Sequence, residues 1–442
     1  MHLSAPSVLL LFGTIATASD LRDPELSYPA YEPDGSELIV PRSEYIDRLQ
    51  GFWLGQCIAN WTGLTTEMDR VEKPFYTDAD WGEPDQKNVW GKLGPAERID
   101  FVLVEEPEAW GADDDTDIEY VYQHLLDEND VSVLSPEQIR DGWLAHMWSD
   151  DFGKSGENFL WVSNESAFEL MRDGTLPPDT SDPERNANYD MIDAQLTTEI
   201  FGLFAPGRPD VAWRMAELPI RTTAREDAQW ASAFYVRMHS QAARLERGKP
   251  SKELILWLAA EARKELPDTS YVADMYDFVR AAYEANPETE DWEATRDAVY
   301  ERYQLGGAAG YDYKQPFDAG INFAASLVSL FYGEGDLKRT LQIGTLAGWD
   351  SDNPTATWGG LLGFLMGREG VEAAFADEDL SELYRISRTR RGFEDRTPDK
   401  AGEDSFPKMA ERGVLLVDRV VLEEMGGGVD LERDIWLIPS AD

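Results

Sequence analysis

The chain has 442 residues, 42% of them hydrophobic and 11% aromatic, which is enough to bury the core of one large domain or two modest ones. Its 85 acidic residues outnumber 40 basic ones and give a formal net charge of −45 at pH 7. This charge would repel nucleic acid and an anionic membrane surface, so neither is expected as a partner.

The N-terminal residues 1–18 have the pattern of a signal peptide. An apolar run from Val8 to Ile15 is followed by Ala16-Thr17-Ala18, an A-x-A pattern that a signal peptidase cuts. The run is too short to anchor the chain in a bilayer, and no later segment reaches 18 uninterrupted apolar residues. We therefore expect export to a bacterial periplasm or medium, with no membrane contact after cleavage. Without a cleaved signal the location would be cytoplasmic.

Residues 19–43 are polar and contain several prolines, which predicts an extended arm or a linker. From Tyr45 onward most segments carry apolar residues at helical spacing, and strand-like alternation is scarce. No fixed-period repeat indicates a solenoid. Residues 44–380 are therefore predicted to form one compact all-α domain of many helices.

Residues 381–442 differ from this pattern. Between Gly413 and Pro439, β-branched runs lie on both sides of Gly426-Gly427-Gly428, which is typical of a hairpin or a pair of edge strands. We expect a small C-terminal β element, formed by a β-hairpin, next to the helical domain.

A first segment of interest, residues 51–67, has small residues at every fourth position. Gly51, Gly55, Ala59 and Gly63 share one face of a helix, and Glu67 lies one step further along. Glycine costs a helix about 1 kcal/mol relative to alanine, so this stripe predicts close approach by another helix. Glu67 is either an exposed acid or a carboxylate at the end of that contact.

The second segment is the aspartate triplet Asp113, Asp114 and Asp115, which stands where a helix should begin. Aspartates suit a helix start because the unpaired N–H groups and the helix dipole favour anions, but one cap needs only one aspartate. Two unit charges about 4 Å apart repel by roughly 4 kcal/mol at an effective dielectric near 20. Either solvent or a cation must offset this repulsion.

The third segment, residues 347–367, places Asp350 and Asp352 directly before Asn353-Pro354 and a glycine-rich helix. Two carboxylates separated by one residue point in different directions and can bridge metal ions. Mg²⁺ prefers hard oxygen ligands of this kind.

The order and type of these three segments resemble the ADP-ribosylglycohydrolase family over about residues 46 to 370. The resemblance implies a compact all-α fold with two Mg²⁺ ions, or Mn²⁺, at the bottom of a cleft. It also implies hydrolysis of the bond between C1″ of ribose and a modified side chain. By resemblance, Glu67 and Asp115 are catalytic. The metal ligands that the resemblance implies are Asp113, Asp114, Asp115, Asp350, Asp352 and Asn353.

Three positions depart from the family pattern. Asp113 stands where the family has Thr or Ser, Asn353 where it has Thr, and Asn60 where an Asp is common. Oxygen ligands remain at the first two positions, so metal binding is still expected, and the departures bear on the choice of substrate.

A middle block, residues 188–234, occupies the place of the segment that lines the ribose in the family. Asp193 and Gln195 are predicted to contact the substrate, with Asn186 and Asn188 as alternatives of equal weight.

The predicted function is metal-dependent hydrolysis of a glycosidic bond in an ADP-ribosylated substrate. Export favours a second interpretation, an extracellular furanoside, and the many tryptophans near the three segments suit sugar stacking. A third is a catalytically inactive, metal-binding or structural relative. A zinc site is not expected, because Cys57 is the only cysteine and His124, His146 and His239 are scattered singly.

Overall fold

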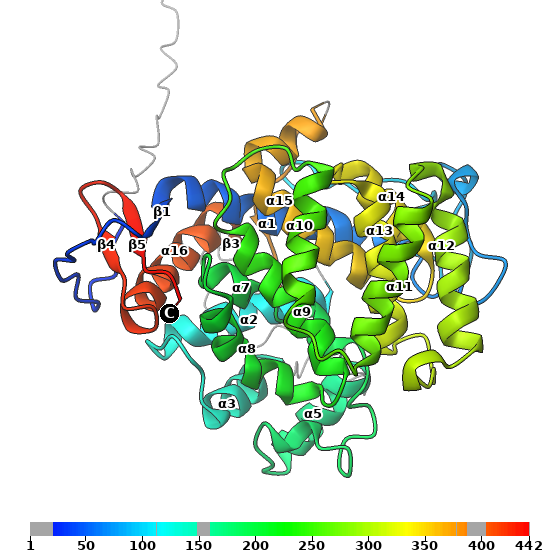
Figure 1. Cartoon of the computed structure of the whole chain (residues 1–442), viewed down its shortest axis with the longest axis horizontal. Helices are drawn as coiled ribbons and strands as arrows, with labels where there is room; N and C mark the ends of the chain where they lie inside the picture. The colour runs from blue at the N-terminus through cyan, green and yellow to red at the C-terminus, as the bar shows by residue number, and fades with distance from the viewer. Residues whose placement is uncertain (1–20, 112, 148–159, 377, 387–403, 442) are drawn as a thin grey trace, which may run out of the picture.

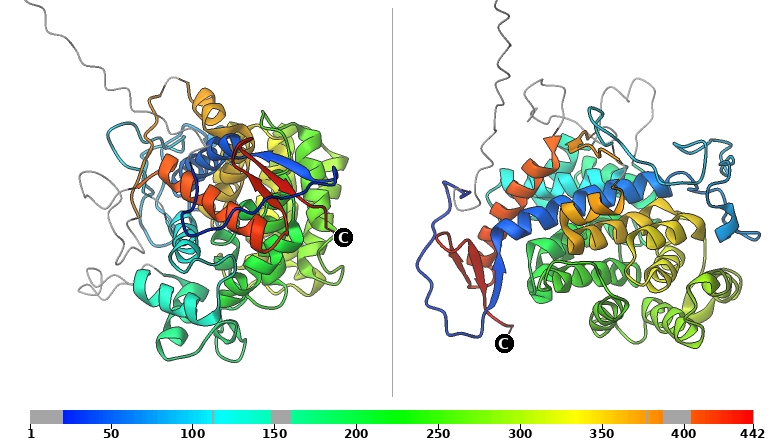
Figure 2. Two further views of the ribbon diagram at one scale, coloured as in Figure 1. Left: turned by 90° about the vertical axis from the view of Figure 1, so that its left-hand side faces the viewer. Right: turned by 90° about the horizontal axis from the view of Figure 1, so that it is seen from above.

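Two long helices, α1 (Arg42–Gly63) and α15 (Asp352–Ala374), lie side by side and organise the protein (Figure 2). The structure is a computed structural model that describes residues 21–111, 113–147, 160–376, 378–386 and 404–441. The predicted signal segment, residues 1–18, lies outside the described residues. In the described part of the chain, no helix combines the length and the apolar character that crossing a bilayer requires.

The helical prediction is confirmed, because helices form most of the described chain (Figure 1). Besides α1 and α15, the helices are α2 (Asp114–Glu128), α3 (Pro136–His146), α5 (Val162–Arg172), α6 (Asp193–Leu196), α7 (Ile200–Phe204), α8 (Pro209–Thr223), α9 (Ala228–Ala242), α10 (Lys252–Arg263), α11 (Tyr271–Ala285), α12 (Trp292–Val299), α13 (Ala319–Gly333), α14 (Leu337–Ala347) and α16 (Phe406–Glu423). Every residue of α13 is buried, so this helix lies in the core.

The contact between α1 and α15 is a contact between backbones. A methyl group at Gly55 would lie 2.3 Å from the carbonyl oxygen of Gly359, and one at Gly363 would lie 2.1 Å from that of Gly51. The small-residue stripe of the first sequence segment therefore faces the glycines of the third. At the end of α1, a methyl group at Gly63 would lie 2.4 Å from Cα of Asp352, so the start of α15 touches the end of α1.

The predicted C-terminal β element is present, with one difference. Strand β5 (Ile435–Ile438) pairs antiparallel with β4 (Gly428–Asp430) and with β1 (Leu38–Pro41), in the order β1-β5-β4. A second, two-stranded sheet pairs β2 (Leu383–Tyr384) with β3 (Asp404–Ser405). The β-branched run after Gly413 is helical, in α16, and the expectation of a strand there is wrong. Buried residues in α16 recur three and four apart, and this helical period prevails over β propensity.

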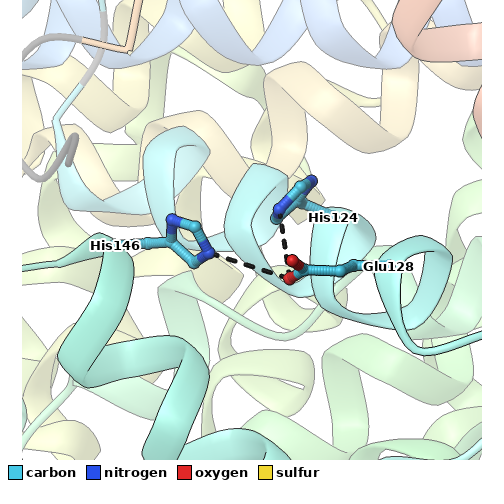
Figure 3. Close-up of side chains that lie close together, drawn as sticks. All are labelled: His124, Glu128 and His146. Carbon is cyan, nitrogen blue, oxygen red and sulfur yellow. Dashed lines mark ion pairs between the residues drawn. The ribbon is translucent and has the colours of Figure 1, made fainter. Parts of the chain in front are cut away.

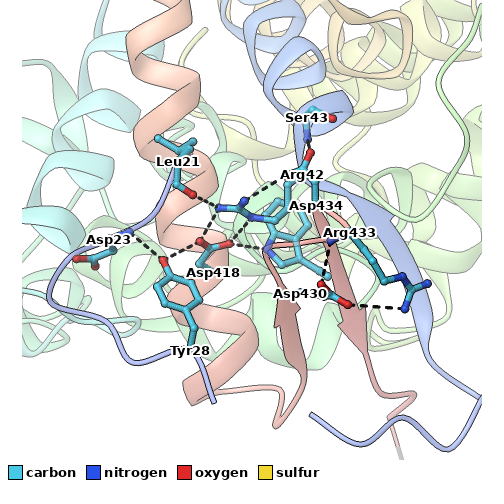
Figure 4. Close-up of polar contacts among 10 residues, drawn as sticks. Leu21, Asp23, Tyr28, Arg42, Ser43, Asp418, Asp430, Arg433 and Asp434 are labelled. Atoms are coloured by element: carbon cyan, nitrogen blue, oxygen red, sulfur yellow. Dashed lines mark hydrogen bonds and ion pairs between the residues drawn. The ribbon is translucent and has the colours of Figure 1, made fainter. Parts of the chain in front are cut away.

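A buried ion pair joins the two ends of the chain (Figure 4). Nη2 of Arg42, the first residue of α1, lies 2.8 Å from Oδ2 of Asp418 in α16, and both side chains are fully buried. Asp418 also accepts hydrogen bonds from Trp436 Nε1 at 2.7 Å and from the Tyr28 hydroxyl at 3.0 Å. This one group of contacts therefore connects the N-terminal arm, α1, α16 and the hairpin of β4 and β5. The predicted boundaries of the arm and the C-terminal extension stay predictions.

Replacing Gly359 by alanine should destabilise the protein. The added methyl would lie 2.2 Å from Cβ of Ala59 and 2.4 Å from the Gly55 carbonyl oxygen, so the helices must separate. Overpacking of this kind costs about 1–3 kcal/mol, which exceeds the gain of about 1 kcal/mol in helix propensity. Urea denaturation measures the free energy of unfolding. Gly248→Ala, whose methyl meets no atom within 4 Å, is the control and should be near neutral.

Candidate metal centre and cleft

The aspartate triplet forms the start of α2, as predicted. Asp113 is the N-cap residue, and its Oδ1 accepts a hydrogen bond from the backbone N–H of Asp114 at 2.8 Å. Asp114 and Asp115 lie in the first turn. Their exposed fractions are 9% and 1%, and that of Asp113 is 7%, so the interpretation of the triplet as solvated surface is wrong.

The Asp-x-Asp segment forms the start of α15 and is held by its neighbours. The backbone N–H of Asp350 donates to Oδ1 of Asn322 in α13 at 3.2 Å, and the Ser351 hydroxyl donates to the carbonyl of Gly63 at 3.0 Å. The side-chain amide of Asn353 donates to Asp350 Oδ2 at 2.5 Å. This segment is therefore fixed against both α13 and the end of α1.

Asn60 of α1 joins the two acidic segments. Its Nδ2 donates to Oδ2 of Asp115 at 2.8 Å and to Oδ2 of Asp352 at 3.3 Å. Its Oδ1 accepts from the backbone N–H of Asp113 at 3.4 Å. Carboxylates that are far apart in the sequence thus meet at one amide, and an aspartate in place of Asn60 would add a further negative charge instead of two donors.

Glu67 lies beside the second acidic segment, just beyond the end of α1. One carboxylate oxygen each of Glu67, Asp350 and Asp352 lies within 4.8 Å of the other two. Glu67 is half-buried, whereas Asp350 and Asp352 are buried. This residue is therefore the acid of the cluster with the greatest access to the cleft.

The buried acids have strongly raised pKa values. Burial, together with the charge of Asp114, raises the pKa of Asp350 to about 8. Burial and then the charge of Asp193 raise the pKa of Asp114 to about 7. Burial also raises the pKa values of Asp115 and Asp352 well above their usual range. Four carboxyl groups therefore resist ionisation unless positive charge is supplied.

Several oxygen atoms in this cluster fit a divalent cation. Oδ1 of Asp115, Oδ1 of Asp352 and Oδ1 of Asn353 are buried and have no hydrogen-bond partner among the described residues. A buried acceptor without a partner is rare and needs an explanation, such as an ion or an ordered water. Carboxylate and amide oxygens are the ligands that Mg²⁺ takes, so the donor set fits the group that the sequence implies.

The acidic cluster opens into a cleft of about 450 Å³. Its acidic lining residues are Glu67, Asp113, Asp114, Asp193, Asp350 and Asp352, and Lys92 is the one basic residue of the lining in the described chain. Trp90, Trp161 and Phe317 form an aromatic wall. The ring centroids of Trp90 and Trp161 are 5.9 Å apart with an interplanar angle of 23°, and Trp90 is similarly stacked on Phe317 at 6.1 Å. Trp90 and Trp161 are 44% and 46% exposed, so part of each ring is accessible to a ligand.

The residues predicted from the middle block lie in different places. Asp193 lines the cleft, but its carboxylate accepts from the Ser163 hydroxyl and from the backbone N–H groups of Ser163 and Asn164, at the start of α5. Gln195 donates to the carbonyl of Ala319 at 2.9 Å and is not among the described residues that line the cleft.

Asn186 donates to the backbone carbonyls of Ser163 and Thr180, and Asn188 donates to that of Val162. Both residues are also absent from the described lining. Of the four residues predicted from the middle block, Asp193 is thus the one that reaches the cleft in the described part of the chain.

Sequence reasoning missed a second pair of buried acids behind the cluster. Glu119, one helical turn after Asp115, accepts from Gln56 Nε2 at 2.8 Å and from the backbone N–H of Ile200 at 2.7 Å. Burial and the neighbouring charge of Glu199 raise the pKa of Glu119 well above its usual range. The spacing of four from Asp115 could have identified Glu119. No local pattern marks Glu199, Trp161 or Phe317.

Comparison with known proteins identifies the family and the fold. The model of the ADP-ribosylglycohydrolase family matches residues 41–397. A solved structure described as an ADP-ribosylglycohydrolase-related protein complex is similar with a TM-score of 0.50 and 14% identity, over 85% of this chain and 99% of that chain. At this identity the similarity shows the fold alone. None of the curated proteins matches the chain. Because the family model covers most of its length, the chain belongs to the ADP-ribosylglycohydrolase family.

Proposed function

We propose that the protein hydrolyses a glycosidic bond at a centre of two divalent cations, Mg²⁺ or Mn²⁺. Family membership supports a hydrolase that acts on a small ADP-ribosylated substrate. The observation that carries the metal-dependent part is the meeting of Asp115 and Asp352 at Asn60, where each carboxylate keeps one buried oxygen without a hydrogen bond in the described chain.

The proposed ligands come from the starts of two helices: Asp113, Asp114 and Asp115 from α2, and Asp350, Asp352 and Asn353 from α15. Asp113 has the weakest claim, because its Oδ1 already caps the helix. When bound, the ions supply Lewis acidity and positive charge for the hydroxyl groups of the sugar. Asn60 fixes the orientation of Asp115 and Asp352 through its two N–H groups.

Glu67 is the proposed acid–base residue. It lines the cleft, is half-buried, and stands within 4.8 Å of the oxygens of Asp350 and Asp352. A carboxylate at this place can orient a water molecule and move a proton to or from it while the bond at C1 of the sugar breaks. Asp115, the other predicted catalytic residue, is almost fully buried and acts through the ligand set.

A second candidate substrate, a neutral glycoside such as a furanoside, is favoured by the lining of the cleft. Even with two divalent cations bound, the six acids and Lys92 leave the lining without a net positive charge for a diphosphate group, whereas the exposed rings of Trp90 and Trp161 suit an uncharged sugar ring. Export, which fits an extracellular glycoside, stays a prediction, because residues 1–18 lie outside the described part. An inactive metal-binding relative is the remaining alternative, and an activity assay separates it from both.

Chelation and Asp115→Asn should have the same effect on turnover. Chelation removes the ions, and the substitution removes one charged ligand. Activity should therefore fall by at least about 100-fold, the upper range for disturbing the surroundings of a metal. The substrates are ADP-ribosyl-arginine, O-acetyl-ADP-ribose and chromogenic pentofuranosides, each with Mg²⁺. Asp141→Asn, at an exposed aspartate of α3, is the matched control and should be fully active. Full activity after chelation would refute the metal-dependent mechanism.

Stability should depend on pH in a direction set by the raised carboxyl pKa values. In metal-free protein, Asp350 and Asp114 hold protons up to pH about 8 and about 7, whereas unfolded aspartates release them near 3.8. The folded state binds more protons, so the free energy of unfolding should fall as pH rises from about 4 to about 8. Saturating Mg²⁺ favours the ionised carboxylates and should remove this fall.

The measurement is urea denaturation across this pH range at constant ionic strength, which holds the screening of the acidic surface fixed. In Asp350→Asn the metal-free slope should be smaller, because one raised group is gone. An identical pH dependence with and without Mg²⁺ would contradict the assignment of these acids as ligands.

Trp90→Ala tests the choice between the two substrates. If a neutral sugar stacks on the aromatic wall, KM for the glycoside should rise roughly two- to tenfold with little change in kcat, because stacking contributes about 0.5–1.5 kcal/mol. Trp257→Ala, at a tryptophan of α10 that is 38% exposed, is the control. An unchanged KM for every active glycoside would exclude the aromatic wall from substrate binding.

A further inference from the structure

A second group of metal-binding side chains lies outside the acidic centre, between α2 and α3. His124 and Glu128 come from the last turns of α2, and His146 is the last residue of α3 (Figure 3). Nε2 of His124 lies 3.4 Å from Oε2 of Glu128, and Nε2 of His146 lies 3.9 Å from the same oxygen. The two imidazole rings are perpendicular, with centroids 4.9 Å apart.

These separations are close to those of three ligands around one tetrahedral ion. Zn–N and Zn–O bonds of about 2.0–2.2 Å at the tetrahedral angle place neighbouring ligand atoms about 3.3–3.5 Å apart. The pair of His124 and Glu128 already has this separation, and that of His146 and Glu128 exceeds it by about half an ångström. One ligand atom from each of the three residues lies within 4.8 Å of the other two. A change in side-chain torsions that brings His146 closer to Glu128 and to His124 would complete the geometry.

The positions of the three residues also suit a bound ion. His124 and Glu128 are four apart on α2, so they project from the same face of the helix. The side chains of His124 and His146 are 16% and 8% exposed, whereas that of Glu128 is 57% exposed. The imidazoles are thus partly withdrawn from water, and solvent can reach the site beside Glu128 to supply a fourth ligand.

The donor set differs from that of the acidic centre. Two imidazoles and one carboxylate favour Zn²⁺ and similar transition metals, whereas Mg²⁺ prefers oxygen ligands alone. His124 follows Asp115 by nine residues on the same helix, a rise of about 13 Å, so the two groups cannot share an ion. We propose that His124, Glu128 and His146 bind one Zn²⁺ ion, independently of the function proposed above.

A bound ion at this site would stabilise the packing of α2 against α3. An ion held by α2 and by the last residue of α3 would fasten the two helices together at the end of α2 opposite the aspartates. The sequence-based expectation of no zinc site rests on histidines scattered singly, and folding brings two of them to one carboxylate. We assign the site a structural role, because it links the ends of two helices and lies outside the described lining of the cleft.

The test is titration of the chelator-treated, full-length protein with Zn²⁺ in excess Mg²⁺, which keeps the acidic centre occupied. We expect one Zn²⁺ per chain, a rise in melting temperature, and a visible absorption band of tetrahedral type when Co²⁺ replaces Zn²⁺. His146→Ala should weaken binding by at least about tenfold, since disturbing even an outer partner of a metal has that effect. Glu128→Gln changes an exposed side chain, keeps the fold, and should also weaken binding.

Two control variants make each outcome decisive. Glu137→Gln, at an exposed acid of α3, and Asp352→Asn, in the acidic centre, should bind Zn²⁺ as the unchanged protein does. Absence of Zn²⁺ binding would overturn the proposal and leave a contact between the two histidines and Glu128 without an ion. Binding that survives in His146→Ala and Glu128→Gln, or that is lost in Asp352→Asn, would overturn it as well, because Zn²⁺ would then occupy another site.

Discussion

The close contact of α1 with α15 is the constraint on which the rest of the structure depends. Gly51 and Gly55 meet Gly363 and Gly359 with backbone against backbone, and no side chain larger than hydrogen fits between them. This contact fixes the start of α15 at the end of α1. The acids of the third sequence segment consequently face Asn60 and Glu67, and α2 brings the aspartate triplet to the same place. A packing requirement thus determines where charge accumulates.

The accumulated negative charge is the reason to expect bound cations at this place. Buried carboxylates at the starts of α2 and α15 gain from the helix dipoles by about 0.3–1 kcal/mol each, which is less than the cost of burying several like charges together. The pKa values of Asp114 and Asp350 are raised because the cost of burying these charges exceeds the gain from the helix dipoles. Protonation can relieve it at low pH and divalent cations can relieve it at neutral pH. The aromatic wall beside the acids is the part of the cleft that we propose contacts the sugar.

Much of the fold and part of the site could be predicted from the sequence, because their signals are local. The spacing of Gly55 and its neighbours predicts a close helix partner, and the composition around Asp114 predicts a helix start; both features are present. The run after Gly413 is rich in β-branched residues but forms a helix, so the strand predicted from its composition is wrong. Trp161 and His146 acquire their surroundings through contacts between distant segments. No periodicity within either segment indicates those contacts.

The central claim is that acids from the two ends of the helical domain share a pair of divalent cations. Anomalous diffraction from crystals of the full chain soaked in Mn²⁺ tests it most directly, because it locates the ions without any assumption about the substrate. We expect two peaks in the space bounded by the carboxylates of α2 and α15, and their loss when Asp115 and Asp352 are both changed to asparagine. Crystals that show no peak there, or that place Mn²⁺ only at other acidic residues, would contradict it.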